Sequence, residues 1–110
     1  MMVTIIKFSE IALSFPEVIE LPHFEKISFR IKNKIFATLC ETTNIGVVKL
    51  SLEDQSAFCS FGENIMTPVK GKWGLKGWTN IDILKADETM ILDALTSSYI
   101  TVAQSRLTKN

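Results

Sequence analysis

The sequence predicts an α+β fold with a central antiparallel sheet, and three observations support this prediction. Residues 27–50 contain short segments in which apolar and polar residues alternate, the pattern of half-buried strands. Apolar residues recur at helical spacing near both ends of the chain. The loops between the early strands are too short for helical crossovers, so these strands must run antiparallel. A chain of 110 residues has the size of one domain, which we expect to span positions 1–110.

The N-terminal part of the chain predicts a helix followed by extended chain. Thr4 to Leu13 has apolar residues at helical spacing, with Thr4 in the position of an N-cap and Pro16 as the stop. The stretch from Phe15 to Phe24 contains two prolines. Since proline cannot donate to a strand ladder, we expect extended chain that fits the edge of a sheet.

A hairpin and a third strand come next. Residues 27–31 and 35–40 each alternate between apolar and polar side chains, and Asn33 lies in the turn between them. Gly46 to Leu50 predicts the third strand. The period of two places one face of each strand in a core.

The second half of the chain predicts a short helix and a last strand. Ser51 resembles an N-cap, with Asp54 three positions on, for a short helix from Glu53 to Phe61. A strand is expected from about Gly77 to Ile83. Alternation within it places Trp78 on the face opposite Thr79.

The C-terminal helix has the strongest pattern. Asp87 and Glu88 stand in its first turn, where negative charge favours the helix dipole, and Arg106 lies near its end. The stripe that should face the core is Met90, Ile91, Ala94, Leu95, Ser98, Tyr99, Val102 and Ala103. We expect Ile91, Leu95, Tyr99 and Val102 to pack on the sheet face that carries Ile27, Phe29 and Ile31.

Charge and cysteine content exclude several classes of function. The formal net charge is +0, so no global field draws the protein to DNA or to an acidic membrane, and nucleic-acid binding would need a local patch. No apolar run is long enough to span a bilayer. Cys40 and Cys59 are far apart, and His23 is the only histidine, so the chain lacks the clustering of a metal or cofactor site. We expect reduced, unlinked, buried thiols and a cytosolic protein.

One segment concentrates unusual chemistry. The Gly/Trp segment, Thr67 to Thr79, holds three of the five glycines, both tryptophans and three lysines. In a functional interpretation, Lys70, Lys72 and Lys76 contact phosphates while Trp73 or Trp78 stacks on a base. In a structural interpretation, the glycines permit tight turns and the tryptophans cover the sheet, which is the commoner case in small domains. We expect the three lysines to be exposed and at least one tryptophan to be mostly buried.

A second basic set lies on the predicted hairpin. Lys26, Arg30 and Lys32 are separated by even numbers of residues, so they should share one strand face, with Lys34 near the turn. Such a row is usually a solvated strand face that discourages edge aggregation. It would extend a basic surface if the hairpin lay beside the Gly/Trp segment. No arrangement of His23 with either cysteine has the spacing of a catalytic pair, so we expect a protein that is not an enzyme.

In the order and spacing of its motifs, the chain resembles the MmcQ/YjbR family over nearly its whole length. The resemblance is carried by Ala12–Val18, Ile27–Ile31, Lys34–Ala37, Val48–Ser51, Pro68–Thr79 and Ala94–Tyr99. It implies an α+β domain similar to the fold of type III secretion chaperones and the CyaY-like group. Family members are described as predicted DNA-binding proteins with a double-wing motif, and the resemblance supplies no catalytic residues.

Two functions therefore compete. The first is nucleic-acid binding through a basic surface formed by Lys70, Lys72, Trp73, Lys76, Trp78, Arg30, Lys32 and Lys34. The second is a protein-interaction or chaperone-like module that uses the sheet surface, with a purely structural Gly/Trp segment. The zero net charge disfavours the first function, and the clustered lysines and tryptophans favour it. Neither function needs a cofactor, and the oligomeric state stays open, with a monomer sufficient for both.

Overall fold

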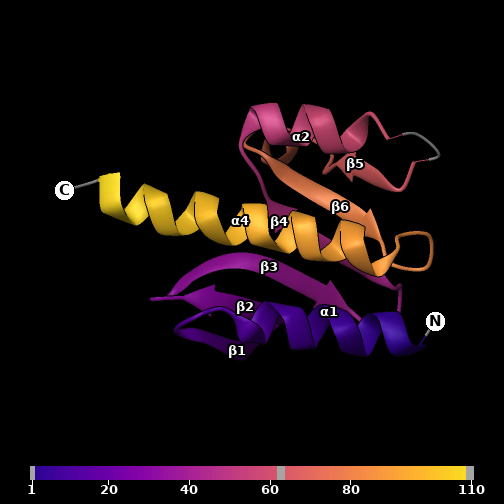
Figure 1. The fold of residues 1–110 in the computed structure, drawn as a ribbon, viewed down its shortest axis with the longest axis horizontal. Helices are drawn as coiled ribbons and strands as arrows, with labels where there is room; N and C mark the ends of the chain where they lie inside the picture. Colours follow the sequence, from indigo (N-terminus) through magenta and orange to yellow (C-terminus); the bar gives the residue numbers. More distant parts are fainter. Residues whose placement is uncertain (1, 62–63, 109–110) are drawn as a thin grey trace.

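The computed structural model describes residues 2–61 and 64–108, and within them one antiparallel sheet is combined with four helices (Figure 1). The strands follow the order β1-β2-β3-β4-β6-β5 across the sheet. The helices are α1 (Met2–Ser14), α2 (Leu52–Cys59), α3 (Lys72–Leu75) and α4 (Glu88–Thr108). The strands are β1 (Val18–His23), β2 (Lys26–Ile31), β3 (Lys34–Cys40), β4 (Ile45–Lys49), β5 (Met66–Pro68) and β6 (Trp78–Asp82). The α+β prediction with an antiparallel sheet is confirmed.

Helices α1 and α4 pack side by side on one face of the sheet, which we call the helical face (Figure 1). Helix α4 lies over β3 and β4, and its Ile91, Leu95 and Val102 are buried. Helix α1 covers β2, where the rings of Phe8 and Phe29 are 6.1 Å apart. The expected burial of Ile91, Leu95 and Val102 is thus confirmed. Phe29, however, is covered by α1 rather than by α4.

The helix ends refine the expectations for the caps. Helix α1 begins at Met2, so Thr4 lies inside it and is not the N-cap. Ser51 does cap α2, since its hydroxyl oxygen accepts from the backbone N–H of Asp54 at 3.1 Å. Asp87 caps α4 by accepting from the N–H of Met90 at 2.8 Å. A side-chain oxygen satisfies one of the otherwise unpaired N–H groups at each of these two helix starts.

Most strands lie where the alternation predicts them. Strand β1 forms one edge of the sheet and pairs with β2, as the two prolines of the stretch from Phe15 to Phe24 suggest. Lys32 and Asn33 form the two-residue turn between β2 and β3, both with positive φ angles, of 50° and 71°. Strand β5 and helix α3 were not predicted, because elements of three and four residues are too short to show a period.

The other face of the sheet is the open face, which is turned away from α1 and α4. Strand pairing aligns Thr38, Val47 and Asn80 in one row across it. Thr79 and Ile81 are buried on the helical side, whereas Trp78 and Asn80 are only half-buried. The prediction that Trp78 faces away from Thr79 is therefore confirmed, and it places this ring on the open face.

Candidate functional site: a groove on the open face

Three hollows that share lining residues run from beside α4, whose Thr101 and Val102 line the first of them, onto the open face of the sheet. The first, of about 400 Å³, and the second, of about 480 Å³, are both lined by Ile35 and Trp78. The second and the third, of about 460 Å³, are both lined by His23 and Lys26. Because each hollow continues into the next, they form one path from the α4 side of the sheet to the turn between β1 and β2. We call this path the sheet groove.

The first hollow lies where β3 and β4 diverge. Their pairing ends at Ala37 and Val48, and the hydroxyl of the fully buried Ser98 on α4 bridges the strands beyond that point. This hydroxyl donates to the carbonyl oxygen of Phe36 at 2.6 Å and accepts from the N–H of Lys49 at 3.0 Å. The bridge satisfies two backbone groups that a continued ladder would otherwise pair.

Glycines shape the Gly/Trp segment where it lines the groove. A Cβ on Gly74 would collide with the carbonyl oxygen of Val69, and one on Gly77 with that of Leu50. Gly77 also has a φ of 105°, which side chains rarely allow. Its carbonyl oxygen accepts from the N–H of Leu50 at 2.9 Å, so the close approach fastens the segment to the end of β4. These two glycines are structural, as the second interpretation of the segment predicts.

The buried side chain of Gln55 on α2 holds the same segment from behind. Its Nε2 atom lies 3.0 Å from the carbonyl oxygen of Gly74, 3.2 Å from that of Trp78 and 3.1 Å from Thr79 Oγ1. One amide thus reaches both the end of α3 and the start of β6. This fixes the backbone that carries both tryptophans.

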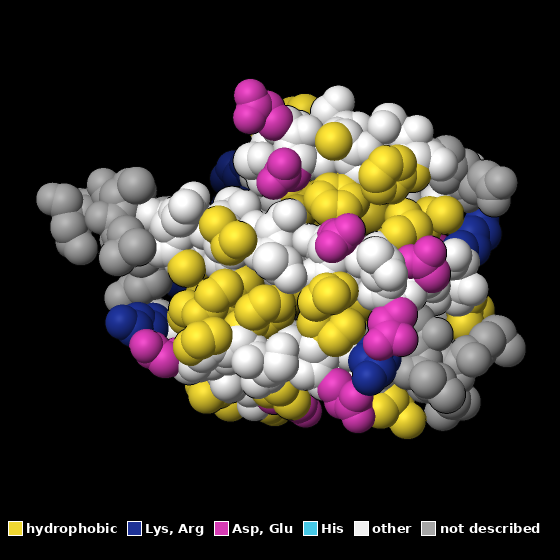
Figure 2. Space-filling model, in the orientation of Figure 1, with side chains coloured by type: hydrophobic (Ala, Val, Ile, Leu, Met, Phe, Trp, Pro, Cys, Tyr) yellow, Lys and Arg dark blue, Asp and Glu magenta, His cyan; other side chains and the backbone are white. Residues whose placement is uncertain are grey.

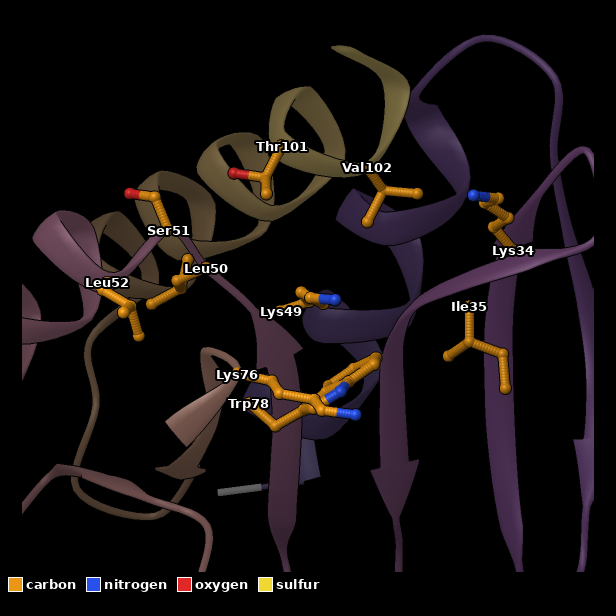
Figure 3. Close-up of a pocket in the computed structure, with 10 residues that line it drawn as sticks. All are labelled: Lys34, Ile35, Lys49, Leu50, Ser51, Leu52, Lys76, Trp78, Thr101 and Val102. Carbon is orange, nitrogen blue, oxygen red and sulfur yellow. The ribbon is translucent and has the colours of Figure 1, made fainter. Parts of the chain in front are cut away.

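Each tryptophan ring in the groove has a lysine over its face. Lys49 Nζ lies 5.6 Å from the ring centroid of Trp78, and Lys76 Nζ lies 5.6 Å from that of Trp73. Figure 3 shows Lys76 and Trp78 extending in the same direction, with Lys34 across from them on β3. Trp78 is half-buried, whereas Trp73 is 55% exposed. Both distances suit a cation–π attraction.

Four lysines from different parts of the chain line the sheet groove. They are Lys26 on β2, Lys34 on β3, Lys49 on β4 and Lys76 after α3. No carboxylate in the described part of the chain forms an ion pair with any of them. Glu25 is the acidic residue among the groove's lining, at its far end in the third hollow. The groove is therefore a local basic surface on a chain whose formal net charge is +0.

The predicted site residues divide into two sets. The structure brings Lys34, Trp73, Lys76 and Trp78 together in the groove, and with them Lys49 and His23, which the sequence did not single out. Lys70 and Lys72 are exposed, as expected, but do not line the groove.

Arg30 and Lys32 also lie outside the groove lining. The Nε of Arg30 donates to Ser28 Oγ at 2.9 Å. The expectation that Lys32 shares a strand face with Lys26 and Arg30 is wrong, because Lys32 lies in the turn, where alternation ends, and pairs with Glu17 at 3.7 Å.

Phe24 stands at the far end of the groove in an unusual conformation. It occupies the two-residue turn between β1 and β2 with a φ of 61°, and 94% of its surface is exposed. Its ring packs edge-on against His23 at 4.8 Å between centroids. A bulky residue in the left-handed region is a strained outlier, and an almost bare aromatic ring gains nothing from burial.

The cysteines are free and half-buried rather than buried as expected. Cys40 Sγ lies 3.3 Å from Thr42 Oγ1, and hydrogen bonding from this hydroxyl and from Thr43 lowers the pKa of the Cys40 thiol to about 7. Burial raises the pKa of Cys59. Among the described residues, no three His, Cys, Asp or Glu side chains are grouped closely enough to hold a metal ion, and no helix there is long and apolar enough to cross a bilayer.

No protein-family model matches the sequence, and no curated protein does either. Among solved structures, the fold is similar to that of the Deinococcus radiodurans protein DR2400, which contains a DUF419 domain. The two structures align with a TM-score of 0.74 at 17% sequence identity, over 84% of this chain and 73% of that one. This likeness establishes that the two proteins share a fold.

Proposed function

We propose that the protein is a non-enzymatic binding domain that takes up nucleic acid in the sheet groove. The observation that carries this proposal is the convergence of Lys26, Lys34, Lys49 and Lys76 on a surface that also presents two tryptophan rings. Lysines without carboxylate partners favour a polyanion, because their counter-charges must come from solution or from a ligand. Aromatic rings among them favour an anion that carries flat bases.

The distribution of charge supports the same partner. On the helical face, acidic side chains are prominent and basic ones lie mainly toward the rim (Figure 2). Lys7 on that face is paired with Glu10 at 3.3 Å and with Glu88 at 3.6 Å. The net charge of +0 is thus the sum of a helical face with prominent acidic side chains and a groove lined by lysines. Local attraction at the groove can operate within a Debye length, about 8–10 Å at physiological salt, even though the whole molecule is neutral.

The proposed relationship to the MmcQ/YjbR family points the same way. DUF419 is related to the fold of that family, whose members are described as predicted DNA-binding proteins. We propose that this chain is a member of the MmcQ/YjbR family. We further propose that the double-wing motif described for that family corresponds to the surface around the groove. A cytosolic location, predicted from two unpaired thiols, is part of the same proposal.

A protein partner is the second candidate, and one observation favours it. Leu75 is 77% exposed and lies in the sequence between two groove residues, Trp73 and Lys76. Contiguous apolar and aromatic exposure is common at protein interfaces. Binding of this kind depends on buried apolar area, so added salt would weaken it little.

Titration of a labelled oligonucleotide over a salt series tests the proposal. The double variant Lys34→Ala/Lys76→Ala removes two groove lysines, and the matched control Lys70→Ala/Lys72→Ala removes two exposed lysines outside the groove. We expect the groove variant to bind more weakly and to lose roughly one unit of salt slope per lost phosphate contact. The control should bind like the parent. Absence of binding at low salt, or equal effects of both variants, would overturn the assignment to the groove.

A further inference from the structure

We propose that the sheet groove selects a single strand, whose unpaired bases stack in succession on Trp78, Trp73 and Phe24. This inference rests on the proposed nucleic-acid function and adds the form of the ligand and its course. The three hollows share their lining residues in pairs, so an extended chain can follow them without leaving the surface. Trp78 lines the first two hollows, Trp73 the second and Phe24 the third.

The exposed rings favour a single strand over a duplex. In a duplex, each base face is already covered by its neighbours, so a protein ring can reach it only after unstacking. In a single strand the base faces are free, and stacking on a protein ring is tolerant of sequence. Trp73, with 55% of its surface exposed, would therefore gain contact from a single strand and little from a duplex.

The lysines are placed to follow the backbone of such a strand. Lys34, Lys49 and Lys76 line the first hollow, and the ammonium groups of Lys49 and Lys76 each lie 5.6 Å from a tryptophan ring centroid. Lys26 continues the series between the second and third hollows. Cations and rings that continue beyond the first hollow into the second and third fit a polymer of nucleotides better than a compact anion, which the three lysines of the first hollow could bind alone.

Phe24 supplies an independent reason to extend the path to the third hollow. A two-residue hairpin turn with positive φ is most easily formed by asparagine or glycine. Phenylalanine at this position carries backbone strain with 94% of its surface in solvent, so neither folding nor packing explains it. A ring that is almost fully exposed at the end of a basic groove, with one edge contact to His23, has the geometry of a stacking platform.

Intrinsic fluorescence tests the stacking directly, because the chain has two tryptophans. Trp73→Phe and Trp78→Phe each leave one reporter, and Trp73→Leu keeps an apolar side chain but removes the ring. We expect oligothymidylate to quench both reporters and its duplex with oligodeoxyadenylate to quench neither. Trp73→Leu should lose roughly tenfold in affinity for the single strand, the order expected for one stacked base, while Trp73→Phe should lose less.

Phe24→Asn tests the far end of the path without harming the fold. Asparagine suits the left-handed turn, so the unfolding midpoint should stay level or rise. Binding of long oligothymidylates should weaken several-fold, and binding of strands too short to pass the second hollow should not change. Equal loss for both lengths, or none for the long strand, would remove Phe24 from the path.

The outcomes separate this inference from the function on which it rests. Equal affinity for duplex and single strand, with lysine dependence but without quenching, would overturn strand selection and leave nucleic-acid binding in place. Absence of binding to either form at low salt would overturn both.

Discussion

The side-chain nitrogen of Gln55 lies 3.0 Å from the carbonyl oxygen of Gly74, and this contact joins α2 to the turn that carries both tryptophans. Gln55 is buried, and its amide also reaches the backbone of Trp78. A buried residue that does not itself line the groove therefore holds the backbone that carries the two tryptophans.

Gln55→Leu should destabilise the protein by about 1–3 kcal/mol, because it removes hydrogen bonds from the buried amide to the carbonyl oxygens of Gly74 and Trp78, each of which keeps a backbone donor. Chemical denaturation would measure the change. Ser56→Ala, on the exposed side of the same helix, should have little effect. Quenching of tryptophan fluorescence by acrylamide should also increase for Gln55→Leu, because the Gln55 amide holds the backbone that carries the tryptophans. Equal unfolding midpoints for Gln55→Leu and Ser56→Ala would show that the Gln55 amide does not stabilise this part of the fold.

Ser98→Ala should lower stability by about 1–3 kcal/mol through a similar mechanism. The hydroxyl of Ser98 is the partner of both the Phe36 carbonyl and the Lys49 N–H, where β3 and β4 separate. Its neighbour Ser97 is half-buried, and Ser97→Ala is the control. Hydrogen exchange at the Lys49 amide should become faster in the Ser98 variant alone. Retained protection there would show that the strands do not need this bridge.

Leu95→Ala should cost about 2–5 kcal/mol, because Leu95 is fully buried in the core and its loss leaves a cavity. Leu92, on the solvent side of α4, is 46% exposed, so Leu92→Ala should cost much less. Thermal or denaturant unfolding distinguishes the two. An unchanged midpoint for Leu95→Ala would contradict the packing of α4 on the sheet.

Cys40 should react with iodoacetamide faster than Cys59 near neutral pH. Hydrogen bonds to its sulfur lower the pKa of Cys40 to about 7, while burial raises that of Cys59. Mass spectrometry of samples alkylated at several pH values should give a half-maximal rate for Cys40 near pH 7. Thr42→Val should move that midpoint upward, and a midpoint that stays in place would exclude the hydroxyl as the cause.

The same thiol links stability to pH in a defined direction. The pKa of Cys40 is lower in the folded state, so the folded protein binds fewer protons between about pH 7 and the ordinary value of 9.0. The stabilising contribution is therefore fully present above pH 9, and it is lost as the pH falls through 7. Cys40→Ser should flatten the pH dependence of stability in that interval. An unaltered pH dependence would show that the thiol does not contribute.

The elements with a full period were predictable. Alternation in residues 27–31 and 35–40 specified the hairpin, and the stripe through Leu95 specified the last helix. These patterns exist because apolar residues occupy the buried face of each element and polar residues occupy its exposed face. Strand β5 and helix α3 contain too few residues to show such a pattern.

The candidate site was predictable only in part. Lys34, Trp73, Lys76 and Trp78 could be named because they lie in two conspicuous segments. Lys49 could not, since a single lysine in a strand pattern resembles any solvated position. It meets Trp78 because β4 and β6 pair in a register that sets these two residues opposite each other.

The sequence by itself determined the periodic elements, the faces they bury and the segments rich in charge and aromatic rings. Only the tertiary structure decided that lysines from three strands and a loop share one groove, that Lys32 does not join them, and that Phe24 stands bare at its end. The physical reason is that polarity along a strand reflects local burial. Which distant strands meet, and in what register, is set by the packing free energy of the whole chain against the entropy of closing its loops.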